Sequence, residues 1–148
     1  NESPDEIYVP YGSGRLFENY LTQQMRNART RDPRLCISQG KLHTMSILGA
    51  EPLKRDSIAD KLTKSCNPFV LFQNHDVAAL GTFAFTGKHT GVYKVAEEKI
   101  QQAYHLLSGY CPIEPSGAAG LALYLQRFEA GHIHPQHKIL VVNTGKGI

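Results

Sequence analysis

The sequence predicts an α/β fold in which a doubly wound, mostly parallel sheet is flanked by helices. Short apolar runs alternate along the chain with longer segments whose apolar residues recur at helical spacing. The last run, Ile139–Val142, is apolar on both faces, as expected for a strand that helices cover on each side. No internal repeat and no linker divides the 148 residues, so we expect residues 1–148 to form a single α/β domain.

The chain opens with a predicted strand, a glycine turn and a helix. Ile7–Tyr11 is a short apolar run that Gly12-Ser13-Gly14 closes. The apolar residues that follow share one helical face: Leu16, Phe17, Tyr20, Leu21 and Met25. Backbone N–H groups and the positive end of this helix would converge at the turn, an arrangement that stabilises an anion. The alternative is a tight turn without a ligand, with Arg15 pointing to solvent.

The middle of the chain continues the alternation. Thr44–Ala50 is a predicted strand that ends before Glu51-Pro52, and a short helix over Ser57–Lys64 has Asp56 or Ser57 as its N-cap. Phe69–Phe72 is either a strand or part of a buried loop, and Gly81–Gly91 is predicted to be an irregular connection.

Another strand and two helices are predicted before the last strand. Val92–Val95 alternates as a strand does, and the helix that follows has acidic residues in its first turn and ends at Gly109. Pro112–Pro115 is predicted to be a strand tip. Ser116 then caps a helix over Gly117–Ala130, which a glycine ends.

Two polar residues follow predicted strands, at the end of the sheet where open α/β folds bind ligands. Thr144 comes directly after the last strand, and Glu114 stands at the predicted strand tip. Thr144 is either a hydroxyl that binds a ligand or a cap in a turn. Glu114 either lines the same pocket or caps the neighbouring helix.

Composition favours a globular protein of the cytoplasm. Hydrophobic residues make up 41% of the chain and charged residues 20%. No apolar run approaches the roughly 18 residues of a membrane span, and the polar first residues form neither a secretory signal nor a transit peptide. The three cysteines lack C-x-x-C spacing, which favours a reducing compartment.

Two clusters have both a functional and a structural interpretation. One consists of basic residues without interleaved aromatics, so a solvated helix end is favoured over a nucleic-acid site: Arg26, Arg29, Arg31 and Arg34. The other consists of imidazoles without a neighbouring carboxylate or cysteine, so a polar surface loop is favoured over zinc: His132, His134 and His137. We therefore expect no nucleic-acid partner and no metal.

Five short segments carry a family resemblance. Tyr8–Leu16 is similar to a V-V-P-x-G-G-G-G-L loop, Ser57–Leu62 to S/T-I-A-D-G-L, and Val92–Ile100 to V-x-V-s-d-e-E-I. Glu114–Ala118 matches E-P-S/A-G-A, and Asn143–Gly147 contains T-G-K-G. In this order the segments resemble the C-terminal half of fold-type II pyridoxal-phosphate enzymes, the group of threonine dehydratase, serine racemase, threonine synthase and the tryptophan synthase β subunit.

The resemblance implies pyridoxal 5'-phosphate as the cofactor and an amino acid as the substrate. Thr144 would meet the pyridine nitrogen of the cofactor, and Glu114 would lie near the ring. The resemblance also implies a homodimer. It assigns the cofactor phosphate to the backbone and side chains of one loop: Gly12, Ser13, Gly14, Arg15 and Leu16.

Several positions depart from the family pattern. Arg15 replaces a glycine of the phosphate loop, where it either crowds the backbone or adds a charge-assisted contact. Asn19 stands where many dehydratases have another glycine, and Lys61 replaces the glycine of S-I-A-D-G. Ser57 aligns with the Asp through which serine racemase and its close relatives bind a divalent ion, so the resemblance carries over no metal site.

The family's Schiff-base lysine, in an S-x-K-x-R-like segment, and its S-x-G-N loop both precede the glycine loop, and neither motif occurs in this chain. The cofactor chemistry needs that lysine amine. We therefore expect a C-terminal fragment of a longer enzyme, with no catalytic residue of its own and no activity alone. The parent is expected to be a lyase that removes the α-proton and eliminates at the β-carbon, as threonine and serine dehydratases do. The alternatives are threonine synthase or another β-replacement enzyme, and a degenerate module that only binds a ligand or a partner.

Overall fold

The computed structural model describes residues 4–30, 45–63 and 87–145, with side chains omitted over residues 25–30. The described elements follow the chain in this order: β1 Glu6–Pro10, α1 Arg15–Thr30, β2 Ser46–Pro52, α3 Asp60–Thr63, β3 Gly91–Val95, α5 Glu97–Ser108, the 3-10 helix η2 Pro115–Ala118, α6 Ala119–Glu129 and β4 Ile139–Val141. The four strands form one parallel sheet in the order β3-β2-β1-β4.

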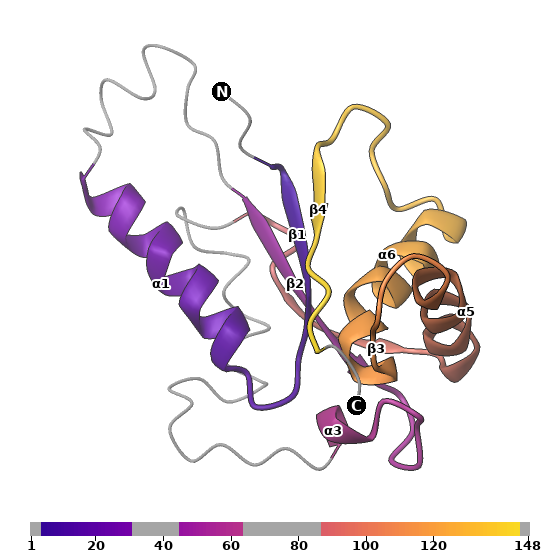
Figure 1. The fold of residues 1–148 in the computed structure, drawn as a ribbon. Coiled ribbons are helices and arrows are strands. Elements are labelled where there is room, and N and C mark those ends of the chain that lie inside the picture. The colour runs from indigo at the N-terminus through magenta and orange to yellow at the C-terminus, as the bar shows by residue number, and fades with distance from the viewer. Residues whose placement is uncertain (1–3, 31–44, 64–86, 146–148) are drawn as a thin grey trace.

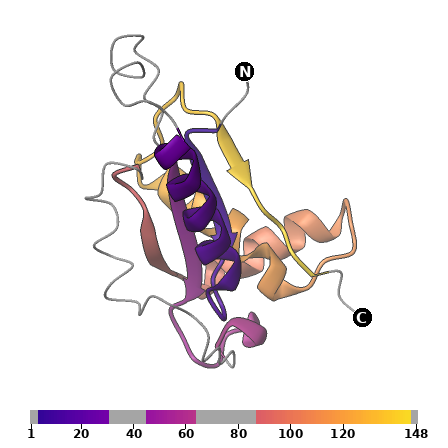
Figure 2. The ribbon, with the colours of Figure 1, turned by 90° about the vertical axis from the view of Figure 1, so that its left-hand side faces the viewer.

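Helices cover the sheet on both faces, with α1 on one side and α5 and α6 on the other (Figures 1 and 2). The strand β1 shows why, because all five of its residues are buried and its side chains alternate between two cores. Ile7 and Val9 pack with Phe17 and Leu21 of α1. Tyr8 packs on the opposite face with residues of α5 and α6. The predicted doubly wound α/β class is confirmed.

The strand order creates a switch point between β1 and β4. The chain passes from β1 to β2 and then to β3 on one side, and it returns to place β4 on the other side of β1. Parallel pairing aligns Tyr8 with Val141, so the carboxyl ends of β1 and β4 lie side by side at the same end of the sheet. Open α/β sheets bind ligands outside the carboxyl ends of the strands at such a point.

The predicted strand tip over Pro112–Pro115 is wrong. Residues 112–114 lie outside the sheet, and Pro115 begins η2. Two prolines in four residues remove the N–H donors that a strand ladder needs. The predicted cap is also wrong, since Ser116 lies buried inside η2 and its Oγ accepts a hydrogen bond from the Lys61 N–H at 3.2 Å.

The last strand is less buried than its sequence predicts. Leu140 is 44% exposed, because β4 forms an edge of the sheet within the described residues. Ile139 and Val141, on the other face, pack against the core under α6.

The predicted helix over Ser57–Lys64 is shorter in the structure and begins at Asp60, after Ser57 Oγ accepts the Ala59 N–H at 3.1 Å. At the end of α6 the prediction holds: Gly131 has a φ of +77°, and the following N–H bonds to the Arg127 carbonyl at 2.9 Å.

Some sequence-based expectations lie outside the described residues. They concern Phe69–Phe72, most of Gly81–Gly91, two of the cysteines and the side chains of the four clustered arginines. Within the described ranges, none of the helices combines the length and the apolar character that crossing a membrane requires.

Candidate cofactor site

The glycine turn after β1 requires its second glycine. Gly14 has a φ of +82°, in the left-handed region that side chains disfavour, and a Cβ there would lie 2.9 Å from the Tyr11 hydroxyl oxygen. Tyr11 is buried, with its ring edge-on to Phe17 at 5.6 Å. Burial, and then the charges of Glu51 and Glu18, raise the pKa of the Tyr11 hydroxyl, so it stays neutral at physiological pH. The turn is therefore held against a fixed aromatic ring.

The turn presents hydrogen-bond donors at the start of a 16-residue helix. Ser13 Oγ accepts the Arg15 N–H at 3.4 Å, and Gly14 O accepts the Glu18 N–H at 2.9 Å, which closes the first helical turn. The Leu16 and Phe17 N–H groups have no acceptor in the described part of the chain, as is usual in a first turn. Donors and the positive end of the helix dipole thus converge here.

The side chains of the loop differ in exposure. Arg15 is exposed and Ser13 is half-buried, whereas Leu16 packs against the core on the α1 face. Leu16 therefore offers a candidate ligand its backbone N–H rather than its side chain.

The Thr144 segment leaves β4 and runs against η2. A Cβ on Gly117 would lie 1.5 Å from the Thr144 carbonyl oxygen, so only glycine fits there. The Thr144 N–H donates to the Gly117 carbonyl at 3.3 Å, and the Val142 N–H donates to the Tyr8 carbonyl at 2.9 Å. These bonds place Thr144, half-buried, just beyond the carboxyl end of β4.

Glu114 joins this segment. A Cβ on Gly145, whose φ is +79°, would lie 2.2 Å from Glu114 Oε1, so the carboxylate packs directly on the residue after Thr144. Glu114 occupies the N-cap position of η2 but makes no side-chain capping bond, so the capping interpretation is wrong. Its Oε2 instead forms an ion pair with Lys61 Nζ of α3. No pattern in the sequence pairs these two residues, although Lys61 stands out as a lysine at a usual glycine position.

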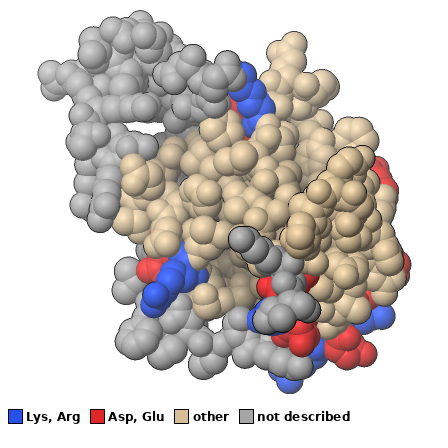
Figure 3. All heavy atoms as spheres, viewed as in Figure 1, with Lys and Arg blue, Asp and Glu red and all other residues tan. Residues whose placement is uncertain are grey.

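The structure brings the predicted site residues together at the carboxyl ends of the strands. Gly12-Ser13-Gly14 follows β1, Thr144 follows the neighbouring β4, and Glu114 packs beside Thr144. Figure 1 shows this end of the sheet at the bottom, with α3 below it. In the space-filling view, charged residues of both signs gather at the lower right (Figure 3).

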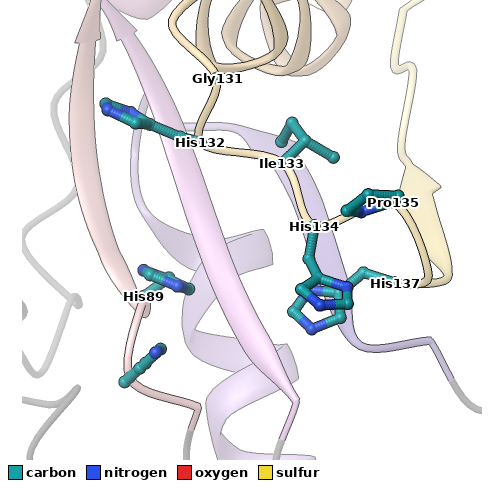
Figure 4. Close-up of a pocket in the computed structure, with 8 residues that line it drawn as sticks. His89, Gly131, His132, Ile133, His134, Pro135 and His137 are labelled. Atoms are coloured by element: carbon teal, nitrogen blue, oxygen red, sulfur yellow. The ribbon is translucent and has the colours of Figure 1, made fainter.

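The histidine cluster lies at the opposite end of the sheet, beside the amino ends of β3 and β4. A pocket of about 430 Å³ opens there, lined by Lys88, His89, Gly131, His132, Ile133, His134, Pro135 and His137 (Figure 4). The His134 and His137 rings stack with centroids 4.7 Å apart. Across the described ranges, no three His, Cys, Asp or Glu side chains come together as metal ligands.

Beside this pocket lies a buried charge cluster that the sequence analysis missed. Glu6 is 1% exposed, and its carboxylate lies 3.8 Å from Arg127 Nη2 and 3.5 Å from His137 Nδ1. The Arg127 Nε–H donates to the Tyr8 hydroxyl at 3.1 Å. Burial, and then the charge of Glu6, raise the pKa of Tyr8, so the hydroxyl remains protonated.

The comparisons with known proteins support the fold. No family model and no curated protein match the sequence. Among solved structures, serine racemase from Dictyostelium discoideum matches 100% of this chain with a TM-score of 0.60 and 23% identity. A threonine deaminase from T.th. matches 99% with a TM-score of 0.58 and 21% identity. A pyridoxal 5'-phosphate-dependent aspartate racemase matches 99% with a TM-score of 0.60 and 15% identity.

The chain spans about half the length of these structures, which it covers to 45%, 51% and 44%. The likeness shows that the chain has the α/β fold of the corresponding portion of these enzymes.

Proposed function

We propose that this chain is the cofactor-binding part of a pyridoxal-5'-phosphate-dependent enzyme that removes the α-proton of an amino acid and eliminates its β-substituent, as threonine and serine dehydratases do. The observation that carries the proposal is the position of the glycine turn and of Thr144, which follow the adjacent strands β1 and β4 at the switch point of the sheet. The structures of the same fold are a threonine deaminase and two amino-acid racemases, one of them described as dependent on this cofactor.

The residues present fit this cofactor. The turn of Gly12-Ser13-Gly14 leads into the N-terminus of α1, where the Leu16 and Phe17 N–H groups have no acceptor in the described part of the chain and a phosphate dianion is stabilised. The Thr144 hydroxyl suits a neutral pyridine nitrogen, whereas a carboxylate at that position would hold the nitrogen protonated.

The chain's own residues bind and orient, and the bound cofactor supplies an electron-withdrawing ring. Backbone N–H groups of residues 12–16 hold the phosphate, with Ser13 adding a hydroxyl and Arg15 a charge. Thr144 fixes the ring nitrogen. The lysine amine that the family uses would come from residues outside 1–148, so residues 1–148 would bind the cofactor without supplying the acid or base.

Titration of the purified protein with pyridoxal 5'-phosphate, followed by absorption and by calorimetry, tests the assignment. Gly14→Asp adds a negative charge to the glycine turn and a Cβ that meets the Tyr11 ring, and we expect the dissociation constant to rise by at least about tenfold. Thr144→Ala removes a hydrogen bond worth about 1 kcal/mol, which corresponds to about fivefold. Unchanged affinity in both variants would refute the site.

Matched controls separate binding from folding. Gly131 also has a positive φ, +77°, so Gly131→Asp imposes similar backbone strain at the opposite end of the sheet, although it lacks the contact of Gly14 with Tyr11, since no atom lies within 4 Å of its Cβ position. Thr22 on α1 donates its hydroxyl to the Glu18 carbonyl at 2.9 Å, and Thr22→Ala is the control for Thr144→Ala. Neither control should change the affinity for the cofactor.

A non-catalytic ligand-binding module is the second candidate, and Lys61 at a usual glycine position favours it. Borohydride reduction of the protein with its cofactor distinguishes the two. A lysine adduct located by mass outside residues 1–148 supports the enzyme, whereas cofactor that binds but leaves no lysine adduct after reduction supports the module.

A further inference from the structure

We propose that Lys61 is a positioning residue that neutralises Glu114 beside Thr144 and thereby keeps the pyridine nitrogen of the bound cofactor unprotonated. This inference rests on the proposed function. It concerns a residue that stands where the resembling dehydratases have glycine, so the device belongs to this chain rather than to the general pattern.

Lys61 is attached to the site in two ways. Its Nζ forms an ion pair with Glu114 Oε2, and its backbone N–H donates to Ser116 Oγ at 3.2 Å. Because Glu114 and Ser116 flank the start of η2, α3 is tied to η2 through both the side chain and the main chain of one residue.

The carboxylate that Lys61 neutralises lies against the ring-nitrogen segment. Glu114 Oε1 is 2.2 Å from the position that a Cβ on Gly145 would occupy, and the carbonyl of Gly117 in the same motif accepts the Thr144 N–H at 3.3 Å. The Glu114 side chain is only 20% exposed, so solvent screens its charge incompletely. An unpaired carboxylate there would favour protonation of a nearby pyridine nitrogen.

The helix α5, which packs against η2, brings mainly acidic groups to this end of the molecule. Its first turn contains Glu97 and Glu98, and Glu97 Oε1 accepts the Ile58 N–H at 2.9 Å. Lys99, in the same turn, forms an ion pair with Glu129 of α6. The charge of Lys99 is therefore balanced by α6 rather than by Glu114.

The other described elements near η2 supply no cation that pairs with Glu114, so Lys61 balances the charge of this carboxylate. Asp60 adds an acid on α3. Arg127 of α6 and Glu6 of β1 lie at the far ends of their elements and face each other. Among the described residues of these elements, Lys61 is the cation that pairs with Glu114.

Lys61 acts through charge rather than as an imine-forming amine. The aldehyde carbon of pyridoxal phosphate is para to the ring nitrogen, so a lysine beside the nitrogen end faces away from the aldehyde. A borohydride-reduced adduct found on Lys61 would overturn this assignment.

The test follows the ring nitrogen of bound pyridoxal 5'-phosphate labelled with ¹⁵N, whose chemical shift reports protonation, across a pH series. Lys61→Met should raise the pKa of that nitrogen by about one unit. In Glu114→Gln the rise should be absent, and the double variant should behave as Glu114→Gln does. Lys61→Gly, which installs the family residue, provides a second variant with the same expected shift.

A matched ion pair supplies the control. Lys94 and Glu51 pair at 2.7 Å with side chains 59% and 18% exposed, close to the 62% and 20% of Lys61 and Glu114. They lie at the ends of β3 and β2, on the far side of β1 from β4. Lys94→Met should leave the nitrogen titration unchanged.

The outcomes separate the two claims. Wild-type protein that does not bind the cofactor refutes the proposed function. Wild-type protein that binds with a Thr144-dependent affinity, but whose nitrogen titration is the same in Lys61→Met, refutes only the role of Lys61. A shift of equal size in Lys94→Met also refutes it, because the shift would then follow from the loss of any nearby positive charge rather than from the pairing of Lys61 with Glu114.

Discussion

Arg127→Met should destabilise the protein strongly, because it removes the guanidinium that balances the buried Glu6 carboxylate and leaves the His137 ring, 3.5 Å away, as its basic neighbour in the described part of the chain. Glu6 is 1% exposed, and both of its oxygens lack a hydrogen-bond partner within the described residues. Arg127 balances this charge from 3.8 Å away and places its guanidinium 5.3 Å from the Tyr93 ring centroid. Methionine keeps much of the apolar stem but removes the charge.

The magnitude follows from the geometry. Two unit charges 3.8 Å apart interact by about 4 kcal/mol at an effective dielectric constant of about 20. The bond from the Arg127 Nε–H to the Tyr8 hydroxyl adds about 1 kcal/mol. Breaking one side of a buried pair costs about 3–5 kcal/mol, and we expect Arg127→Met to fall in this range.

Urea unfolding followed by circular dichroism measures this loss, and the double variant Glu6→Gln with Arg127→Met tests its cause. Removing both charges should recover at least about half of the loss, since no uncompensated ion then remains buried. Tyr8→Phe, which removes only the hydrogen bond, should cost about 1 kcal/mol. A loss below about 1 kcal/mol in Arg127→Met, or a double variant no more stable than the single one, would refute the reasoning.

Two further predictions concern other positions. Burial, and then the charge of Arg127, lower the pKa of His89, so the unfolded chain binds more protons than the folded one at acidic pH. Stability should therefore fall as the pH drops through about 6.5, and His89→Gln should flatten this fall in urea unfolding at several pH values, whereas the exposed control His105→Gln should not. Gly117→Ala should cost about 3 kcal/mol and weaken cofactor binding, because its Cβ would meet the Thr144 carbonyl, whereas Gly109→Ala, with its nearest contact at 3.7 Å, should do neither.

The local pattern of the sequence predicts the elements whose burial is periodic. β1, α1, β3 and α5 form where apolar spacing places them, and the glycine after α6 ends that helix. The failures at β4 and at Glu114 depend on contacts between distant parts of the chain, whereas the prolines that exclude a strand over Pro112–Pro115 act locally. The exposure of Leu140 depends on the edge position of β4, and the Lys61–Glu114 pair joins residues 53 positions apart. The sequence pattern also does not reveal that Glu6 is buried, because its cation comes from α6.

Some glycines of the site are needed for packing alone and therefore carry no evidence about function. Gly117 and Gly120 are required by packing, because a Cβ on Gly117 would meet the Thr144 carbonyl, and a Cβ on Gly120 would crowd the carbonyl oxygens of Tyr8 and Val142. A non-catalytic relative with this fold would need them as well, so the match to E-P-S-G-A supports the fold rather than the chemistry.

The positions that distinguish an enzyme from a module are those that packing does not fix. Ser13 and Arg15 stand where the similar V-V-P-x-G-G-G-G-L loop has glycine, and the Arg15 side chain is exposed and lies outside the core. If Arg15 contacts phosphate, Arg15→Gly should weaken binding of pyridoxal 5'-phosphate by about fivefold to tenfold, the loss of one charge-assisted bond, and should leave the unfolding free energy within about 1 kcal/mol. If the arginine crowds the loop instead, the same substitution should tighten binding. Calorimetry of the two proteins side by side decides between these signs, and the sign shows whether the loop is still adapted to hold the cofactor.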